Sequence, residues 1–596
     1  MKCCKNHIPK CISKVITLLA LCCALWSYAH GQTTVSEGAL ANMPVKEVTI
    51  FKDGHVFVVH EGKVPVDSQG DVVLDYLPCP VLGTFWPYSA NPKVKLSAVV
   101  AGRRIVSLNR TALTVRELIQ ASPGAKVRIK EQNQAQPYQA TILSIPSRST
   151  EELAKTSPPG TEEMLPQQGN IVLLQTAEGV KAVPLDRIEE VTFVDEPKNA
   201  VTQKDYRNLM TLKLNWDNRK SEQTADVGMA YVQLGIRWIP SYRVEIDGTG
   251  NAVIELQATL INELTDLRDV TANLVIGVPT FAFKDQVDPI SLQRTVAQLS
   301  PYFRADSRTA FALSNAIMSQ SAPSRYDGAR EDESGRAGII DLGPEVTGSL
   351  RNEDLYVFTV EHITLKKGQR MVLPVSEFKL KYKDVFTLDL PFGPPPEVRH
   401  NFNNQQQAEI ARFLLAPRLM HKIRLENDSK YPLTTAPALI FRKGRVIAQA
   451  MMKYTPVAGS TDLDLTIAVD ITTEKTDKET GFTPDAEKWG GDRYGRRDLT
   501  GTITLTNRRT DKVYIEVVRS ILGHIDTADQ DGTIDHLDRM ESGWMLTDGT
   551  PFWWNWYGWP HWWYYFNSVG RVTWKFELEP GKTKNLNYNW KYFWRQ

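Results

Sequence analysis

The sequence predicts an all-β protein made of several β-sandwich domains, with a small SH3-like barrel near the N-terminus and a partly disordered central insertion. Apolar and polar residues alternate in three consecutive runs between Gly235 and Pro279, and this two-residue period is typical of half-buried strands. Asp247–Asn251, between the first two runs, is rich in residues that tolerate positive φ, so we expect a hairpin there. Similar runs fill residues 44–106 and most of the chain after residue 354, which extends the prediction to sandwich domains.

The first 31 residues have the composition of a secretory signal peptide. Four lysines precede Val15–Trp26, an apolar run that is too short to span a bilayer. Ala29–Gly31 then offers small residues for cleavage. We therefore predict a signal peptide over residues 1–31 and an exported protein, periplasmic or extracellular, with a lipid anchor at Cys22 as the alternative. No later run is apolar enough for a transmembrane segment.

Charge and cysteine content restrict the function further. The 596 residues carry 70 Lys and Arg against 69 Asp and Glu, a balance that gives no reason to expect a nucleic-acid partner. Five of the six cysteines lie in the predicted signal peptide, so we expect no intramolecular disulfide in the exported chain. The remaining one, Cys79, is predicted to be a small buried apolar side chain, and a catalytic thiol is the alternative.

Two small domains are predicted after the signal peptide. Residues 44–123 form an N-terminal β domain that ends in a short helix, because Thr114 and Glu117 have the spacing of a capping box. Residues 124–196 hold five short strands with a turn at Pro184–Arg187. Closely spaced strands of this kind indicate a small SH3-like barrel.

The rest of the chain, residues 205–596, is predicted to form the β-sandwich domains. Residues 291–352 interrupt it as an insertion, which we expect to be weakly helical at first and disordered afterwards, because its second part is polar and lacks periodicity. Ser147–Gln168, inside the barrel, is expected to be a mobile polar excursion. Asp477–Asp498 is polar and contains two adjacent glycines, so it is predicted to be a loop.

Several blocks of this last region resemble a bacterial family, the domain of unknown function 4139. They include the opening Trp238–Tyr242, then Asn262 and Gly277–Pro279, and later LKKGQRMVLPV, YTPVAGSTDLDLTIAVD, TLTNRRTDKVYIEV and WKFELEPG. Leu267 departs from the family, which commonly has Trp there. The resemblance implies a β-sandwich envelope protein, distantly similar to mucoidy-inhibitor-like proteins, and implies no catalytic residues. We expect Trp238 and Tyr242 to anchor the sandwich core.

The segment Phe552–Phe566 is almost entirely aromatic, and we expect a long loop or an added hairpin. Its rings form a satellite core, or they are exposed and recognise a glycan or a protein, or they lie at a membrane surface. These three readings predict different exposure of the rings. If the segment binds a partner, the residues predicted to make contact are Trp553, Trp554, Trp556, Tyr557, Trp559, Trp562, Trp563 and Tyr564.

A second candidate is the acidic stretch Thr527–Asp538. Asp529, Asp531, Asp535 and Asp538 fall at positions three, five, nine and twelve of a calcium loop. Thr527 stands where the loop needs an acid, and Asp538 stands where a glutamate is expected. The flanks also have strand character, so we favour a solvated acidic turn over a metal site.

The sequence assigns no reaction, because it holds none of the common catalytic motifs. We therefore predict a secreted or periplasmic binding or envelope-scaffold protein that needs no cofactor. Its expected partner is a protein or glycan of the cell envelope. The alternative is a glycan-active enzyme or a carbohydrate-binding protein that grips its ligand with the aromatic segment 552–566; an enzyme of this kind would need two carboxylates close to these rings.

Overall fold

The computed structural model describes residues 35–134, 136–158, 164–277, 279, 281–292, 355–415, 417–537 and 551–596. Strands make up 59% of it and helices 10%, in several sheets, which confirms the all-β prediction. The predicted signal peptide and the predicted insertion beyond Leu292 lie outside the described residues. No helix among the described residues is both long and apolar enough to cross a membrane.

The chain divides into two compact units. Of the described residues, those up to 44, those in 60–231 and those in 285–292 form the N-terminal unit. The described residues in 45–59, 232–284 and 355–596 form the C-terminal unit.

Two long antiparallel strands, β7 (Lys95–Thr111) and β15 (Ala200–Asn215), form the frame of the N-terminal unit. They share a five-stranded sheet in which Val73, Val106 and Leu209 are fully buried. The remaining elements of this frame are β1 (Val35–Ser36), η1 (Glu37–Ala39), β2 (Leu40–Ala41) and β5 (Val72–Leu74), with β6 (Trp86–Ser89) paired to β16 (Thr224–Leu234).

A buried hydrogen-bond chain crosses this unit. His60 Nδ1 lies 3.0 Å from the Met43 carbonyl oxygen, and its Nε2 lies 2.9 Å from the Tyr231 hydroxyl. The Tyr231 hydroxyl lies 2.8 Å from that of Tyr76. Because a carbonyl only accepts, Nδ1 carries the proton, so the Tyr231 hydroxyl donates to Nε2 and accepts from Tyr76. Cys79, predicted to be a small buried side chain, is 7% exposed and forms no disulfide with any described residue; its Sγ lies 2.9 Å from the Ser291 hydroxyl.

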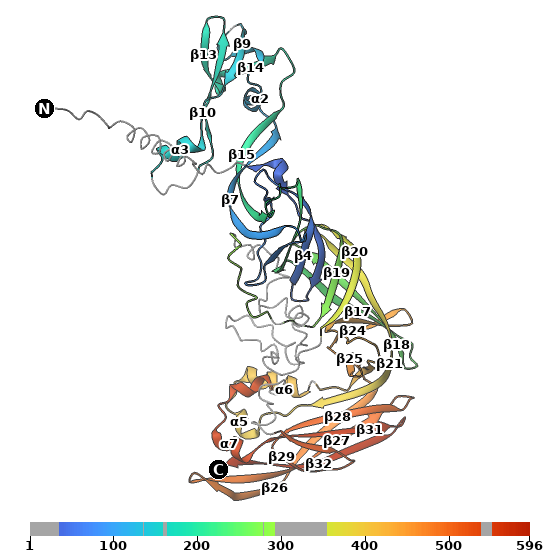
Figure 1. The fold of residues 1–596 in the computed structure, drawn as a ribbon. Helices are drawn as coiled ribbons and strands as arrows, with labels where there is room; N and C mark the ends of the chain where they lie inside the picture. The colour runs from blue at the N-terminus through green and yellow to red at the C-terminus, as the bar shows by residue number, and fades with distance from the viewer. Residues whose placement is uncertain are drawn as a thin grey trace, which may run out of the picture. The chain divides into compact units, whose positions relative to one another are not determined.

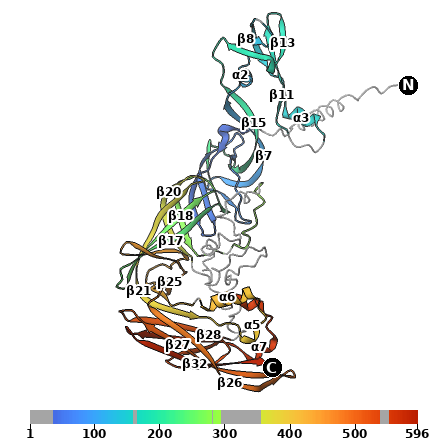
Figure 2. The ribbon, with the colours of Figure 1, turned by 180° about the vertical axis from the view of Figure 1, so that it is seen from behind.

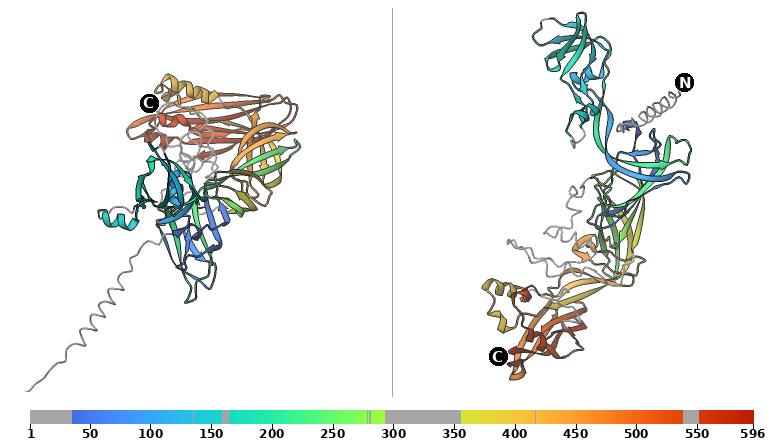
Figure 3. Two further views of the ribbon diagram at one scale, coloured as in Figure 1. Left: turned by 90° about the horizontal axis from the view of Figure 1, so that it is seen from above. Right: turned by 60° about the vertical axis from the view of Figure 1, so that its left-hand side comes forward.

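The small barrel lies between β7 and β15 in the sequence. Its strand order is β13-β12-β9-β8-β14, so four strands follow one another and the fifth returns beside the first, as in an SH3-like barrel. The predicted turn before the last strand is the 3₁₀ turn η2 (Leu185–Arg187). In Figure 3 the teal barrel strands continue from the long blue and green ribbons of β7 and β15. The strands are β8 (Lys126–Glu131), β9 (Tyr138–Ser144), β12 (Ile171–Thr176), β13 (Gly179–Pro184) and β14 (Ile188–Phe193).

Two helices accompany the barrel. Helix α2 (Val115–Ala121) has the predicted capping box, in which the Thr114 side chain accepts from the Glu117 N–H and the Glu117 carboxylate accepts from the Thr114 N–H. Its Ile119 packs into the barrel core. The polar excursion holds more structure than predicted: α3 (Thr150–Thr156) lies between the paired strands β10 (Ser147–Arg148) and β11 (Gln167–Gln168).

The C-terminal unit opens with the three predicted strands, β17 (Ile236–Ile246), β18 (Asn251–Asn262) and β19 (Leu267–Ile276). Gly248 and Gly250 have positive φ in the predicted hairpin turn. Trp238 and Tyr242 are buried as expected. The Trp238 indole donates to the Val275 carbonyl at 3.1 Å, and the Tyr242 hydroxyl accepts from the Thr434 N–H at 2.8 Å.

An asparagine that recurs at three strand ends organises this unit. Asn262, Asn427 and Asn507, the corner asparagines, are each at most 1% exposed. Each corner asparagine lies where the first strand of a four-stranded repeat ends, before the second strand begins. The first strand pairs antiparallel with the fourth, and the second strand pairs antiparallel with the third. The three repeats are β18, β19, β20 (Tyr356–Leu365) and β21 (Arg370–Leu390); β22 (Met420–Glu426), β23 (Ala436–Arg442), β24 (Arg445–Met452) and β25 (Ser460–Ile467); and β27 (Asp492–Asn507), β28 (Val513–Leu522), β31 (Val569–Leu578) and β32 (Thr583–Arg595).

Each corner asparagine makes the same side-chain bonds. The Asn507 amide donates to the Asp511 and Leu578 carbonyls, both at 3.0 Å, and its Oδ1 accepts from the Arg509 N–H at 2.9 Å. The amide therefore ties the turn that follows it to the end of the third strand. The equivalent acceptors are Thr265 and Leu365 for Asn262, and Tyr431, Thr455 and Pro456 for Asn427; the equivalent donors are Leu264 and Ser429.

The backbone of each corner asparagine closes onto the turn between the third and fourth strands. The Asn507 N–H donates to the Lys582 carbonyl, and the Gly581 N–H donates to the Asn507 carbonyl at 2.8 Å. Gly581 has φ +68°, and Gly368 and Ala458 occupy the equivalent places with φ +84° and +63°. Glycine adopts this region freely, whereas alanine does not.

The connection between the second and third strands differs among the repeats. In the second repeat it is only Lys443–Gly444. In the first repeat it contains the predicted central insertion, and in the third it contains β29 (His524–Ala528), β30 (Thr533–Leu537) and the aromatic segment. The two most unusual stretches of the sequence therefore enter the fold at equivalent places.

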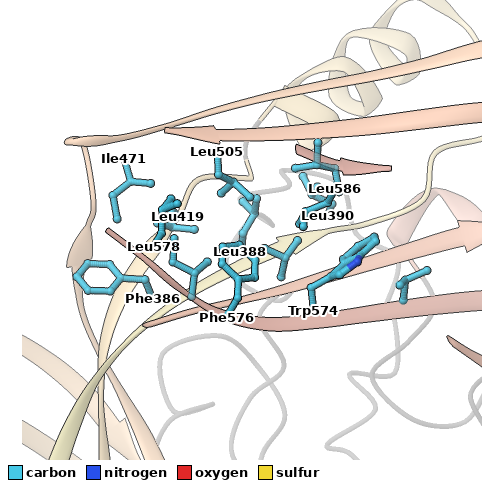
Figure 4. Close-up of a cluster of buried hydrophobic side chains, with 14 of the residues drawn as sticks. Phe386, Leu388, Leu390, Leu419, Ile471, Leu505, Trp574, Phe576, Leu578 and Leu586 are labelled. Atoms are coloured by element: carbon cyan, nitrogen blue, oxygen red, sulfur yellow. The ribbon is translucent and has the colours of Figure 1, made fainter. Parts of the chain in front are cut away.

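The third repeat builds a two-layered sandwich with β21 and β26 (Ile471–Trp489) (Figure 1). One layer has the order β21-β28-β31-β30, and the other has the order β26-β27-β32-β29. Figure 4 shows Leu388 and Trp574 from the first layer and Leu505 and Leu586 from the second around one shared core.

The predicted loop Asp477–Asp498 is wrong, because β26 and β27 form a long hairpin there. Gly490 and Gly491, with φ +62° and +90°, make its two-residue turn. Most of this part of β26 is exposed and polar, so no apolar period marks it as a strand. Helices α5 (Pro396–Arg399) and α6 (Asn404–Leu415) were not predicted, and strands β3 (Val45–Ile50) and β4 (His55–Pro65) fall within the predicted strand-rich region 44–106.

Candidate functional site

The aromatic segment is helical, and the predicted loop or hairpin is wrong. It contains the 3₁₀ helix η6 (Phe552–Trp556) and the helix α7 (His561–Phe566). Pro551 and Pro560 occupy the N-cap positions. Aromatic residues have no strong helical preference, so packing of their rings and not propensity accounts for these helices.

The segment forms a satellite core at one end of the C-terminal sandwich. Trp553, Trp554, Trp562 and Trp563 are at most 8% exposed, so these four predicted contact residues present no free ring face to a ligand. They pack on side chains of α5, of α6 and of the β21–α5 connection, close to the C-terminus in Figure 2. The other four predicted contact residues, Trp556, Tyr557, Trp559 and Tyr564, are partly buried against the same cluster.

Ring-on-ring contacts hold this core together. Trp554 stacks on Trp559 with 4.3 Å between the ring centroids, and Trp562 meets Trp594 edge-on at 5.2 Å. The Trp559 indole N–H donates to the Trp554 carbonyl at 3.1 Å. Contacts of this kind add about 0.5–1.5 kcal/mol each beyond the burial of area, so most of the segment stabilises the fold.

Three aromatic rings remain on the outside of this core and define the aromatic platform: Trp489, His561 and Tyr565. Tyr565 is 64% exposed and Trp489 is 38% exposed. The Trp489 ring is nearly parallel to both others, with centroid distances of 5.8 Å to His561 and 5.5 Å to Tyr565. The platform was not predicted, because Trp489 belongs to the stretch interpreted as a loop.

Each of the three platform rings is carried by an element of regular secondary structure. His561 and Tyr565 are four residues apart in α7 and therefore lie on one face of that helix. Trp489 ends β26, directly before the turn glycines, and pairs with Asp492 across the hairpin. Tyr494, fully buried beneath, contacts Trp562 and Phe566. The platform therefore rests on a packed core, which reduces the entropy lost when a ligand binds.

Two groups of carboxylates near this end of the sandwich already have partners. The Tyr588 hydroxyl donates to Asp477 at 2.7 Å, and Arg519 donates to the same carboxylate at 3.2 Å. In a second group, Glu397 accepts from the Tyr592 hydroxyl at 3.2 Å and pairs with Arg497 at 2.9 Å. In both groups the negative charge of the carboxylate is balanced by a neighbouring arginine.

The electrostatics of Asp477 do not match those of a catalytic acid. Burial raises the pKa of the Asp477 carboxyl, but the neighbouring Arg519 and Lys475 lower it more, so that this pKa lies below its usual value. Burial also raises the pKa of the Tyr588 and Tyr592 hydroxyls well above the ordinary value. A glycosidase of the usual type needs one carboxyl whose pKa is raised, so that it can donate a proton; Asp477 has the opposite shift.

The acidic stretch is a turn between the two sandwich layers. Its flanks are the strands β29 and β30, as expected, and Gln530 and Asp531 adopt positive φ. The Asp529 carboxylate accepts from the backbone N–H and the side-chain amide of Asn587, at 2.7 and 2.8 Å. Asp535 is exposed in β30, and Asp538 lies outside the described residues.

Within the ranges that the structure describes, no group of three or more His, Cys, Asp or Glu side chains is placed to hold a metal ion. The Asp529 carboxylate instead anchors the turn to β32 through Asn587.

Comparison with known proteins adds no relative: no family model matches the chain, and no curated protein matches it. The resemblance to the domain of unknown function 4139 therefore stays a prediction based on the sequence blocks. The geometry of the C-terminal unit carries the functional argument.

Proposed function

We propose that this protein is an exported binding protein of the cell envelope and that its aromatic platform recognises a glycan. The observation that carries the proposal is the stacked, solvent-exposed pair of Trp489 and Tyr565 on a rigid aromatic core. Flat exposed rings contact the apolar face of a sugar over a large area and lose little side-chain entropy on binding.

Export rests on the lysine-rich start and the apolar run Val15–Trp26. The family resemblance points to the same compartment, since it implies an envelope protein. A binding role agrees with the pairing of Asp477 and Glu397 to arginine and tyrosine, because these carboxylates act in the fold. An enzyme acting on glycans is the less supported alternative.

A glycan array tests the platform. The purified protein should bind one or more arrayed glycans, and Trp489→Ala and Tyr565→Ala should each weaken that binding about tenfold through the loss of a stacking ring. Trp86→Ala is the matched control, because Trp86 is 69% exposed in β6 of the N-terminal unit, and it should leave binding unchanged.

A stability measurement separates the platform from the core beneath it. Trp563→Ala should lower the free energy of unfolding by about 3–5 kcal/mol, because Trp563 is 1% exposed. Tyr565→Ala, two residues further along the same helix, should change it by less than about 1 kcal/mol. Equal glycan binding by the wild type and both platform variants would refute the proposal.

A further inference from the structure

A groove on the outer face of a sheet lies away from the aromatic platform in the structure of the C-terminal unit. The sheet is β24-β23-β17-β18-β21, and the opposite face of these strands packs into a separate core. The groove has a volume of about 810 Å³, which falls in the range of ligand-binding clefts. We call it the sheet groove.

The sheet groove runs across the strands. The strand pairings place Gln449, Leu439, Arg243, Glu255 and Glu377 side by side on five successive strands. Neighbouring strands are about 4.8 Å apart, so this row extends over roughly 20 Å. A second row beside it contains Ser241, Gln257 and Pro374. The groove therefore fits an extended ligand that crosses several strands.

Arg243 is held in place at the centre of the groove. Its guanidinium donates to Glu255 at 2.9 Å and to Glu245 at 3.4 Å, and it lies 5.0 Å from the centre of the Phe441 ring. Glu245 is fixed in turn, because it accepts from the Gly444 N–H at 3.0 Å. A donor fixed in this way loses little entropy when it binds a ligand.

Other polar groups of the groove are left available. The side chains of Ser241, Gln257, Ser376 and Gln449 make no hydrogen bond to any residue in the described part of the chain. Leu439 and Phe441 supply apolar surface between them. Amide, hydroxyl and guanidinium groups spaced along apolar contacts match a ligand that carries many hydroxyl groups on an apolar frame.

Charge and topology restrict the ligand further. Glu255 and Glu245 compensate Arg243, and Glu377 adds a further negative charge, so an acidic polymer would be repelled. Peptides that bind by strand addition need an unpaired strand edge. In this sheet order β24 is an edge strand, whereas β23, β17 and β18, which the groove crosses, each have neighbours on both sides.

We propose that the sheet groove is a second binding site, which takes an uncharged oligosaccharide chain. This inference does not depend on the platform, because the two surfaces share no residue. The ligand lies across the strands, the amides of Gln257 and Gln449 bind its hydroxyls, and Phe441 and Leu439 contact its apolar faces.

Calorimetry of the whole protein with cellohexaose, laminarihexaose, maltohexaose and chitohexaose tests the site. At least one of these neutral chains should bind, and the double variant Gln257→Ala/Gln449→Ala should weaken that binding about tenfold or more. Ser376→Trp, which fills the groove without removing these amides, should abolish it. Gln139→Ala, an exposed glutamine on a barrel strand, is the matched control and should bind as the wild type does.

The platform variant Trp489→Ala distinguishes the two proposals. Unchanged affinity of this variant for the hexasaccharide, together with loss in the groove variants, supports a separate site. Loss in Trp489→Ala with unchanged binding by the groove variants overturns the sheet groove and leaves the platform standing. Binding of none of the four chains, or stronger binding of an acidic oligogalacturonate than of all of them, also overturns the inference.

Discussion

The corners at Asn507 and Asn427 make the same hydrogen bonds with different residues in the turn. At Asn507 the turn position with positive φ is Gly581, whereas at Asn427 it is Ala458 with φ +63°. Left-handed backbone costs a residue with a Cβ about 1–2 kcal/mol. The buried asparagine and its hydrogen bonds are common to both corners and the glycine is not, so we infer that the amide can hold even an unfavourable turn in place.

The largest expected effect comes from removing the amide. Asn507→Ala should lower the free energy of unfolding of the C-terminal unit by about 2–4 kcal/mol, because it leaves the buried Leu578 carbonyl and the part-buried Arg509 N–H without their partner. Tryptophan fluorescence during urea unfolding follows this unit, where most tryptophans lie.

The control for this variant is Asn585→Ala, at an exposed position in β32, which should change the free energy of unfolding by less than about 0.5 kcal/mol. A similar loss in both variants would show that the corner amide has no special part in stability.

An intermediate effect is expected when Gly581 at the Asn507 corner is replaced by alanine, the residue at the equivalent position of the Asn427 corner. Gly581→Ala should lower the free energy of unfolding by about 1 kcal/mol, through backbone strain alone, because a Cβ there meets no atom within 4 Å. Gly102→Ala in β7 also has open space and lacks positive φ, so it should not be destabilising. Unchanged stability of Gly581→Ala would mean that this turn carries no strain.

The smallest effect is the reverse exchange. Ala458→Gly should raise the free energy of unfolding by less than about 1 kcal/mol, because relief of the strained φ exceeds the extra freedom of glycine in the unfolded chain. Thermal unfolding of the single variant, next to that of Ala450→Gly in the neighbouring strand β24, measures the difference. A lower unfolding temperature for Ala458→Gly would contradict the assigned strain.

The strands with one buried face were predictable from sequence, and those without one were not. Alternation located β17, β18 and β19, because each buries every second residue. The outer half of β26 has no such period, since solvent covers both of its faces. The threefold repeat was also missed, although the sequence carries a signal for it. In each repeat the first strand ends at an asparagine. A later turn holds the residue whose N–H donates to the carbonyl of that asparagine, which is Gly368, Ala458 or Gly581.

The site was predictable in part. The unusual composition of Phe552–Phe566 drew attention to the end of the sandwich where the proposed aromatic platform lies. Which rings are buried depends on α5 and α6, which carry no comparable signal, and on a hairpin about 70 residues away that brings Trp489 onto α7. The sheet groove gave no signal at all, because its residues come from five strands distributed between Ser241 and Gln449.

The repeats also show where the aromatic segment enters the fold. The connection between the second and third strands is two residues long at Lys443–Gly444, so the fold does not need a longer one. The aromatic segment occupies the same connection in the third repeat. Loops that the fold does not require can acquire residues for recognition. Two residues of the proposed aromatic platform, His561 and Tyr565, lie in this connection.

The buried chain of His60, Tyr231 and Tyr76 has a consequence for the acid tolerance of the N-terminal unit. Burial lowers the pKa of His60 below its usual value, and the Met43 carbonyl only partly offsets this. The unfolded chain therefore binds a proton at His60 at a higher pH than the folded chain does. The contribution of neutral His60 to the free energy of unfolding is complete above about pH 6.5 and is lost as the pH falls below that value. A mildly acidic environment would thus lower the stability of the N-terminal unit at His60, whereas the corner asparagines of the C-terminal unit do not titrate.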